Sequence, residues 1–137
     1  MEIAEKYDFI VIDDSKLDCF IAEKIIQNTG KSTSIKTFMA GSDALAYLQS
    51  LAISELQQKI IILLDIQMPV MNGFEFVEAF ELTIPEKLKK QICINLLSSS
   101  INESDMIRAQ SYHSIFRFLN KPLNKDILLN TIQEWQF

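Results

Sequence analysis

Apolar and polar residues follow two different patterns along the chain, one typical of strands and the other typical of helices. Five short apolar runs lack a helical period and predict strands at Tyr7–Ile12, Ser34–Phe38, Ile60–Leu64, Ile92–Leu97 and Ile115–Leu119. After each run, apolar residues recur three or four positions apart, as on one face of a helix, in Ser15–Thr29, Ser42–Leu51, Phe74–Leu82, Asn102–Tyr112 and Asn124–Trp135. This alternation predicts a doubly wound α/β fold, (βα)5, with a five-stranded parallel sheet covered by helices on both faces.

The run Ile60–Leu64 is apolar at every position, which fits a strand buried on both faces of the sheet. It ends at a single carboxylate, Asp65. Pro69 prevents a smooth continuation of the strand, and Asn72-Gly73 indicates a turn before the next helix. The sequence therefore places an aspartate at the carboxyl end of a central strand, where open α/β sheets bind ligands. A carboxylate that only solubilises a loop is the alternative interpretation.

Two local patterns give further expectations. Ser15, with Asp18 three residues later, is suited to cap a helix that stops at Gly30. Its apolar residues fall on one face, formed by Leu17, Phe20, Ile21 and Ile25. The Lys-rich segment at 87–90 is expected to be a solvated loop.

Length and composition restrict the class of protein. With 137 residues, 48% of them hydrophobic and 23% charged, the chain is expected to be one globular domain over residues 1–137. A net charge of -5 argues against nucleic acid as a direct partner. No apolar run reaches the roughly 20 residues of a membrane helix, and the N-terminus lacks the apolar core of a signal peptide, so we expect a cytoplasmic protein. Cys19 and Cys93 are far apart in apolar segments, which favours buried free thiols over a redox or zinc site.

Chemically active side chains follow four of the five predicted strands. They are Asp13 and Asp14, Asp65, Ser98, and Lys121. The carboxyl ends of parallel strands meet at one edge of a sheet, so these residues should converge. Clustered carboxylates repel one another and either take up a proton or recruit a cation, and oxygen ligands of this hardness suit Mg²⁺. Lys121 could pair with Asp65 or with a phosphoryl group, to which the Ser98 hydroxyl could also donate. A buried ion-pair cluster that only fixes the sheet edge is the alternative.

Four segments carry a resemblance to a known family. They read Ile-Asp-Asp-Ser at 12–15, Asp-Ile-Gln-Met-Pro-Val-Met-Asn-Gly at 65–73, Leu-Ser-Ser-Ser at 97–100 and Phe-Leu-Asn-Lys-Pro-Leu at 118–123. In this order and spacing, the chain resembles the receiver domains of two-component response regulators over essentially its whole length. The resemblance implies a flavodoxin-like sheet with strand order 2-1-3-4-5.

The resemblance also implies a phosphorylation chemistry. Asp65 would accept a phosphoryl group from a histidine kinase or a histidine phosphotransfer protein. Mg²⁺ would be bound by Asp14, Asp65 and the backbone carbonyl of Gln67, with Asp13 acting through water. Such a protein is a signalling switch rather than an enzyme, apart from slow self-dephosphorylation.

Further roles carried over from the family concern the switch itself. Lys121 and Ser98 would contact the phosphoryl oxygens, and the Lys121-Pro122 peptide bond would be cis. Phe118 matches the aromatic residue whose rotamer follows the hydroxyl residue inward, although Phe has no hydroxyl of its own; a packed core residue is the alternative. The surface that binds a downstream target would lie within residues 102–135.

Two positions are implied to tune the lifetime of the phosphoryl group. Gln67 and Ser100 match the variable positions that set how fast the acyl phosphate hydrolyses. The chain ends at Phe137, directly after the last predicted helix. If this is the natural terminus, we expect a stand-alone regulator that works by phosphorylation-dependent binding or as a phosphorelay intermediate; a longer protein trimmed to its receiver would end in the same way.

Three other functions fit the sequence less well. An aspartyl phosphohydrolase of the haloacid dehalogenase type needs a second acid two residues after the nucleophile, where this chain has Gln67. A flavodoxin-like cofactor carrier needs a hydroxyl-rich phosphate loop, where this chain has Asp13 and Asp14. A pseudo-receiver, a binding module that works without phosphorylation, predicts the loss of a site residue, and none is lost. His113, the single histidine, is expected to be a surface residue.

Overall fold

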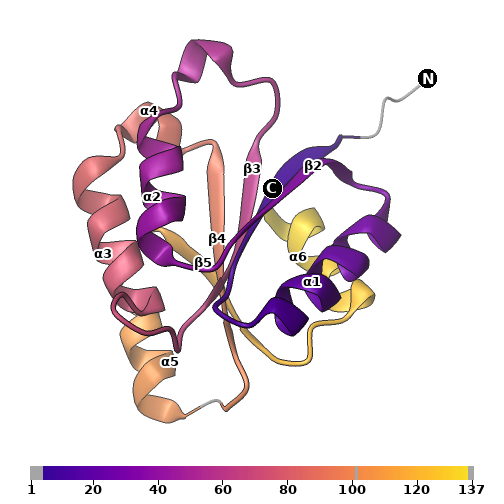
Figure 1. The fold of residues 1–137 in the computed structure, drawn as a ribbon, viewed down its shortest axis with the longest axis vertical. Helices are drawn as coiled ribbons and strands as arrows, with labels where there is room; N and C mark the ends of the chain where they lie inside the picture. Colours follow the sequence, from indigo (N-terminus) through magenta and orange to yellow (C-terminus); the bar gives the residue numbers. More distant parts are fainter. Residues whose placement is uncertain (1–4, 101, 136–137) are drawn as a thin grey trace.

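Five parallel strands form the centre of the molecule (Figure 1). The structure is a computed structural model in which residues 5–100 and 102–135 are described. The strands are β1 (Tyr7–Ile12), β2 (Ser32–Phe38), β3 (Ile60–Asp65), β4 (Ile92–Ser98) and β5 (Ile115–Asn120). Their order across the sheet is β2-β1-β3-β4-β5, which confirms the expected topology.

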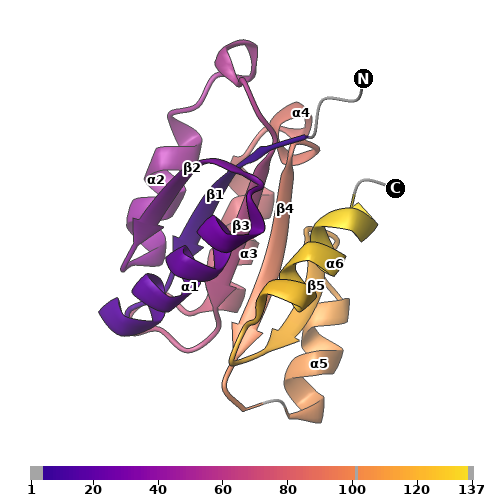
Figure 2. The ribbon, with the colours of Figure 1, turned by 90° about the vertical axis from the view of Figure 1, so that its right-hand side faces the viewer.

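The helices pack on both faces of the sheet, as the alternation of elements predicts (Figures 1 and 2). Their bounds are α1 (Lys16–Thr29), α2 (Gly41–Gln49), α3 (Gly73–Thr83), α4 (Glu86–Lys89), α5 (Glu103–Gln110) and α6 (Lys125–Trp135), with a short 3-10 turn, η1 (Ile53–Glu55). Helices α1 and α6 cover one face, and α2, α3, α4 and α5 contribute to the core on the other. None of the helices within the described ranges is long and apolar enough to cross a membrane.

The strand β3 shows why a run without polar positions marks the middle of the sheet. All six of its residues are buried. Ile60, Ile62 and Leu64 face the core under α2 and α3, whereas Ile61 and Leu63 face the core under α1 and α6. Both faces need apolar side chains, so the pattern cannot alternate.

Side-chain caps fix where the helices begin. The Ser15 Oγ accepts a hydrogen bond of 3.2 Å from the Asp18 backbone N–H at the start of α1. Gly30 ends α1 with a left-handed φ of 69°, which glycine adopts without steric cost. Asn72 and Glu75 form a reciprocal capping box at the start of α3.

One local expectation is wrong, and the apolar face of α1 lies on an unexpected side of the helix. The Lys-rich segment at 87–90 is not simply a solvated loop, because α4 forms there and buries Leu88. The α1 face that carries Leu17, Phe20 and Ile21 points to solvent, with 67%, 55% and 43% of these side chains exposed. The buried residues of α1 are instead Cys19, Ala22 and Ile26, and Ile25 is partly buried against the same core.

The two cysteines match the expectation. Cys19 and Cys93 are free and buried. His113 is exposed in the turn between α5 and β5, as expected for a surface residue.

Candidate functional site

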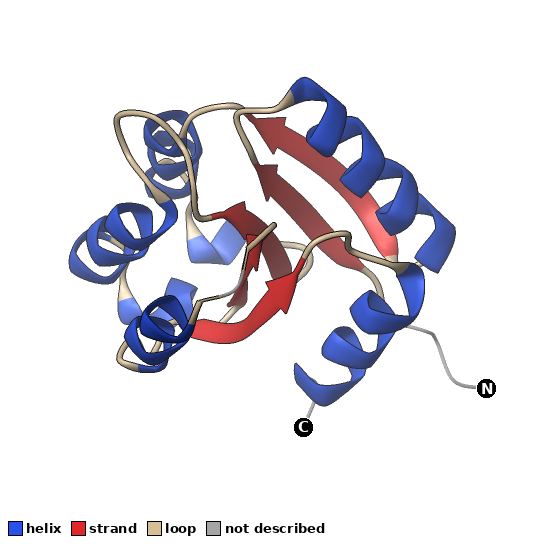
Figure 3. Ribbon diagram, turned by 90° about the horizontal axis from the view of Figure 1, so that it is seen from below, coloured by secondary structure: helices blue, strands red, loops and turns tan. Residues whose placement is uncertain are grey.

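The carboxyl ends of β1 and β3 bring three carboxylates together. Ile12 of β1 is in register with Leu64 of β3, so the residues that follow them, Asp13 and Asp65, meet at the sheet edge. Figure 3 shows the sheet from below, with helices on both of its faces. Both are buried, with 3% and 8% of their surface exposed, whereas Asp14 is exposed. One carboxylate oxygen from each of the three residues lies within 4.8 Å of the others.

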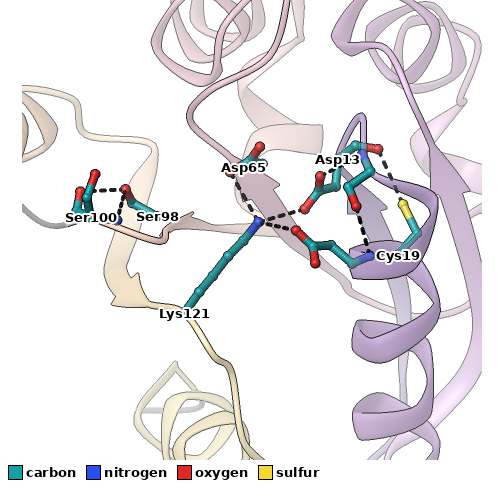
Figure 4. Close-up of polar contacts among 8 residues, drawn as sticks. Asp13, Cys19, Asp65, Ser98, Ser100 and Lys121 are labelled. Atoms are coloured by element: carbon teal, nitrogen blue, oxygen red, sulfur yellow. Dashed lines mark hydrogen bonds and ion pairs between the residues drawn. The ribbon is translucent and has the colours of Figure 1, made fainter.

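Lys121 brings a positive charge to this edge from the residue directly after β5. Its ammonium lies 2.9 Å from Asp13 Oδ2, 3.0 Å from Asp18 Oδ2 and 3.4 Å from Asp65 Oδ1. Figure 4 shows the Lys121 side chain extended between the strand ends toward Asp13 and Asp65. The backbone N–H of Lys121 donates to the Ser98 carbonyl oxygen at 2.8 Å. The Lys121-Pro122 peptide bond is cis, as the resemblance implies.

Burial and the neighbouring charges shift the ionisation of this cluster. The pKa of Asp65 is raised to about 6, mainly because burial disfavours the carboxylate and also because Asp13 is negative, while Lys121 opposes the rise. Burial on its own would lower the pKa of Lys121. Hydrogen bonds to Asp13 and Asp18, together with the negative charges of Asp13 and Asp65, instead raise the pKa of Lys121 above its ordinary value. The ammonium is therefore firmly charged.

Asp13 is held in place by α1 as well as by Lys121. Its Oδ1 accepts a 3.0 Å hydrogen bond from the Ser15 N–H, and its backbone carbonyl accepts a 3.3 Å contact from the Cys19 thiol. Burial, with the nearby carboxylates, raises the pKa of Cys19 to about 11, so the thiol stays protonated and can keep donating.

The loop after β3 folds back on the strand end. Gly73 N donates to the Ile66 carbonyl at 2.8 Å, and a Cβ at Gly73 would lie 2.9 Å from the Asp65 carbonyl oxygen. The start of α3 therefore touches the backbone that carries Asp65, an approach that only glycine permits. The same loop leaves Gln67 exposed beside the carboxylates.

The loop reverses direction at an exposed residue with unusual backbone geometry. Val70 has a φ of 68°, a left-handed conformation that is rare for a β-branched residue. The Met71 N–H donates to the Pro69 carbonyl at 2.7 Å across it, which closes a γ-turn.

Ser98 lies at the end of β4, with its hydroxyl engaged locally. The Ser98 Oγ donates to the Ser100 carbonyl at 2.7 Å and accepts from the Ser100 N–H at 3.2 Å (Figure 4). To contact a phosphoryl group on Asp65, the hydroxyl must give up its bond to Ser100. Phe118, on β5, is half-buried against the core and is in register with Leu96.

Asp18 is the member of the cluster that the sequence analysis missed. Its position in the sequence predicts only helix capping with Ser15, yet its carboxylate accepts a hydrogen bond from Lys121 Nζ. The signal was its place four residues after Asp14 in the first turn of the helix that starts at the site. A side chain one turn into such a helix still lies close to the sheet edge.

The donor set fits a magnesium ion. Asp13, Asp14 and Asp65 offer hard carboxylate oxygens at close range, partly open to solvent through Asp14. The excess negative charge of the three acids over the single ammonium also favours a divalent cation.

Comparison with known proteins agrees with this geometry. The sequence pattern of the response regulator receiver domain matches residues 9–133. A response regulator receiver protein from Dyadobacter fermentans is 35% identical, with a TM-score of 0.86 over 95% of this chain and 98% of that one. A two-component response regulator from Cytophaga hutchinsonii is 26% identical, with a TM-score of 0.87 over 97% of this chain and 98% of that one. A probable methanogenesis regulatory protein, FilR2, from Methanothrix harundinacea is 24% identical over 98% of this chain and 84% of its own length.

Proposed function

Because this chain belongs to the family of response regulator receiver domains of two-component signalling, we propose that it is a switch operated by phosphorylation of Asp65. The observation that carries the proposal is the convergence of Asp13, Asp14 and Asp65 with the ammonium of Lys121 at one sheet edge. A phosphoryl donor, a histidine kinase or a histidine phosphotransfer protein, would deliver the group from a phosphohistidine.

The chemistry is a transfer between two nucleophiles. An oxygen of the Asp65 carboxylate attacks the phosphorus as the bond from phosphorus to the histidine nitrogen breaks, and the nitrogen leaves with that electron pair. The products are an aspartyl phosphate and a free histidine. Lys121, already 3.4 Å from Asp65, neutralises charge on the phosphoryl oxygens.

A bound Mg²⁺ ion would supply the remaining positive charge for the carboxylate and the phosphoryl group. Asp14, Asp65 and the backbone carbonyl of Gln67 would hold it, with Asp13 contributing through water. Gln67 and Ser100, both exposed at the rim of the site, are placed to affect how readily water reaches the acyl phosphate.

The switch itself depends on Ser98. Its hydroxyl would exchange the Ser100 carbonyl for a phosphoryl oxygen, and Phe118 on the neighbouring strand would follow the loop inward. Reversing a 1:99 population needs about 5.5 kcal/mol. Two or three charge-assisted hydrogen bonds, at about 1.5–3 kcal/mol each, supply that amount.

The readout surface would be formed by α5, β5 and α6. Exposed apolar side chains of Met106 and Ile107 on α5 and of Ile127 on α6 lie on these elements. A downstream target protein that binds them would distinguish the two states. The alternative, a protein-interaction module that works without phosphorylation, leaves the ion pairs of Lys121 and Asp65 without a function.

The test is intact mass after incubation with acetyl phosphate and Mg²⁺. We expect the gain of one phosphoryl group, dependent on Mg²⁺ and absent in Asp65→Asn. Asp43→Asn, which removes an exposed carboxylate from the first turn of α2, serves as a control and should be phosphorylated normally. If the folded wild-type protein gains no mass from acetyl phosphate or from a phosphorylated histidine phosphotransfer protein, the pseudo-receiver alternative holds.

A further inference from the structure

The Lys121 ammonium contacts three carboxylates in this site, at unequal distances. Lys121 Nζ lies 2.9 Å from Asp13 and 3.0 Å from Asp18 but 3.4 Å from Asp65. The cation is therefore drawn toward β1 and α1, away from the proposed phosphoryl acceptor. Asp18 lies outside the carboxylate group that fits a metal ion, which consists of Asp13, Asp14 and Asp65.

A phosphoryl group on Asp65 changes this balance. It brings additional negative charge and three strong acceptor oxygens next to Lys121. The ammonium has three N–H donors, so a closer bond to the phosphoryl group competes with its existing bonds.

The contact to Asp18 is the one that can be given up. The Asp13 side chain is only 5% exposed and is also fixed by the Ser15 N–H, so it cannot move to water. The Asp18 side chain is 39% exposed, so water can replace the ammonium. Its position in the first turn of α1 also favours a free carboxylate there, because the N-terminus of a helix is partly positive.

We propose that Asp18 is a positioning residue for Lys121, which holds the ammonium back in the unphosphorylated protein and releases it to the phosphoryl group. The proposal rests on the phosphorylation of Asp65 proposed above. In this proposal the Asp18 carboxylate opposes phosphorylation of Asp65. Because Asp18 belongs to α1, phosphorylation would also change the contact between α1 and Lys121.

The structure gives α1 a means of responding to this release. A cavity of about 310 Å³ lies between α1 and the segment after β5, lined by Ile21 and Ile25 on one side and Pro122 and Leu123 on the other. Asp18 and Lys121 both line it. Their ion pair therefore bridges the cavity, and breaking it loosens the connection between α1 and the segment that leads into α6.

The first experiment measures affinity for beryllofluoride, a phosphoryl mimic that binds a carboxylate, by fluorine NMR titration in saturating Mg²⁺. We expect Asp18→Asn to bind about two- to tenfold more tightly than wild type, the range between an exposed ion pair and a charge-assisted hydrogen bond. The matched control Asp43→Asn removes the same charge from the first turn of α2 and should bind like wild type. Asp18→Glu, which restores a carboxylate, should return the affinity to that of wild type.

The second experiment is a crystal structure of the wild-type protein with beryllofluoride and Mg²⁺. We expect Lys121 Nζ to contact a fluorine of the mimic and to lie beyond ion-pair distance of Asp18. A merely structural role for Asp18 in α1 would leave the Lys121 contact unchanged.

The outcomes separate the two proposals. If wild type binds beryllofluoride through Asp65 but Asp18→Asn binds equally or more weakly than Asp43→Asn, or if Lys121 still contacts Asp18 in the complex, the role of Asp18 is refuted and the phosphoacceptor stands. If wild type and Asp65→Asn both fail to bind the mimic, the phosphoacceptor itself is wrong and the role of Asp18 falls with it.

Discussion

At the scale of single residues, Asp65 is an acid whose ionisation the fold opposes. Its pKa is raised to about 6 in the folded chain, against about 3.9 for an aspartate in an unfolded chain. The folded state therefore binds this proton more tightly. The contribution of Asp65 to the free energy of unfolding is most favourable below about pH 4 and is lost as the pH rises through about 6.

Asp65→Asn should consequently stabilise the Mg²⁺-free protein. At about pH 7.5 we expect a gain on the order of 2 kcal/mol in the free energy of unfolding, which falls to roughly half at about pH 5. Urea denaturation at both pH values measures the difference. A gain independent of pH, or a loss of stability at neutral pH, would contradict the raised pKa.

Gly73 is the second residue with a measurable consequence. A methyl group there would lie 2.9 Å from the Asp65 carbonyl oxygen and from the Ile66 Cα. Gly73→Ala should therefore displace the end of β3, lower the free energy of unfolding by about 1–3 kcal/mol, and slow phosphorylation by acetyl phosphate.

Gly30→Ala provides the matched control for this substitution. Gly30 has a left-handed φ of 69° but open space around it, so alanine there costs about 1–2 kcal/mol of stability without touching the site. The idea that Gly73 positions Asp65 fails if both variants are phosphorylated at the wild-type rate.

At the scale of elements, α1 is the helix for which the sequence pattern does not reveal the buried side. Periodicity identifies an apolar face but does not say that it is buried, and here Cys19 and Ala22 pack inward while Leu17 and Phe20 face solvent. Small residues pack closely on the sheet, which the periodicity of large side chains could not reveal. An exposed apolar face on a helix that begins at the proposed phosphorylation site is well placed to bind the protein that brings the phosphoryl group.

Phe20→Ala should therefore slow phosphorylation of Asp65 by a phosphorylated histidine protein about fivefold or more, the effect of losing about 1 kcal/mol at an interface. Acetyl phosphate, which needs no docking surface, should react at the wild-type rate. Leu82→Ala removes another exposed apolar side chain, from the far end of α3, and should affect neither reaction. Equal slowing with both donors would point to damage at the site rather than to docking.

Other elements were predicted closely. The strand ends at Ile12 and Phe38 and the cap at Ser15 agree with the sequence, because apolar runs and capping side chains are local signals. The short helix α4 was missed because its formation depends on burying Leu88 in the shared core, which is a tertiary effect.

At the scale of the whole molecule, the candidate site could be predicted because parallel strands point their carboxyl ends to one edge. That rule brings Asp65 and Lys121 together without any knowledge of side-chain conformation. It does not reveal which acids the ammonium contacts, so the bond from Lys121 to Asp18 and the engagement of Ser98 with Ser100 emerge only from the structure.

Mg²⁺ should stabilise the entire fold, because the proposed ligands are assembled only in the folded chain. A concentration near 100 times the dissociation constant adds about 2.7 kcal/mol to the free energy of unfolding, visible as a higher thermal midpoint. Asp14→Asn should remove most of this gain and, since Asp14 is exposed, should leave the metal-free stability nearly unchanged. An equal rise in both proteins, or the same rise with a monovalent salt of matched ionic strength, would speak against a specific site.

The distance along the chain between Asp13 and Lys121, 108 residues, has a consequence for the protein while it is being made. A nascent chain that has emerged only as far as β4 carries the three clustered acids but lacks Lys121, whose ammonium offsets their negative charge. Its acceptor aspartate would lack Lys121, and its carboxylates would repel one another until β5 docks at the edge of the sheet. If Asp65 is the acceptor proposed above, a copy cut short before Lys121 should accept phosphoryl groups poorly and should not compete for them with complete copies.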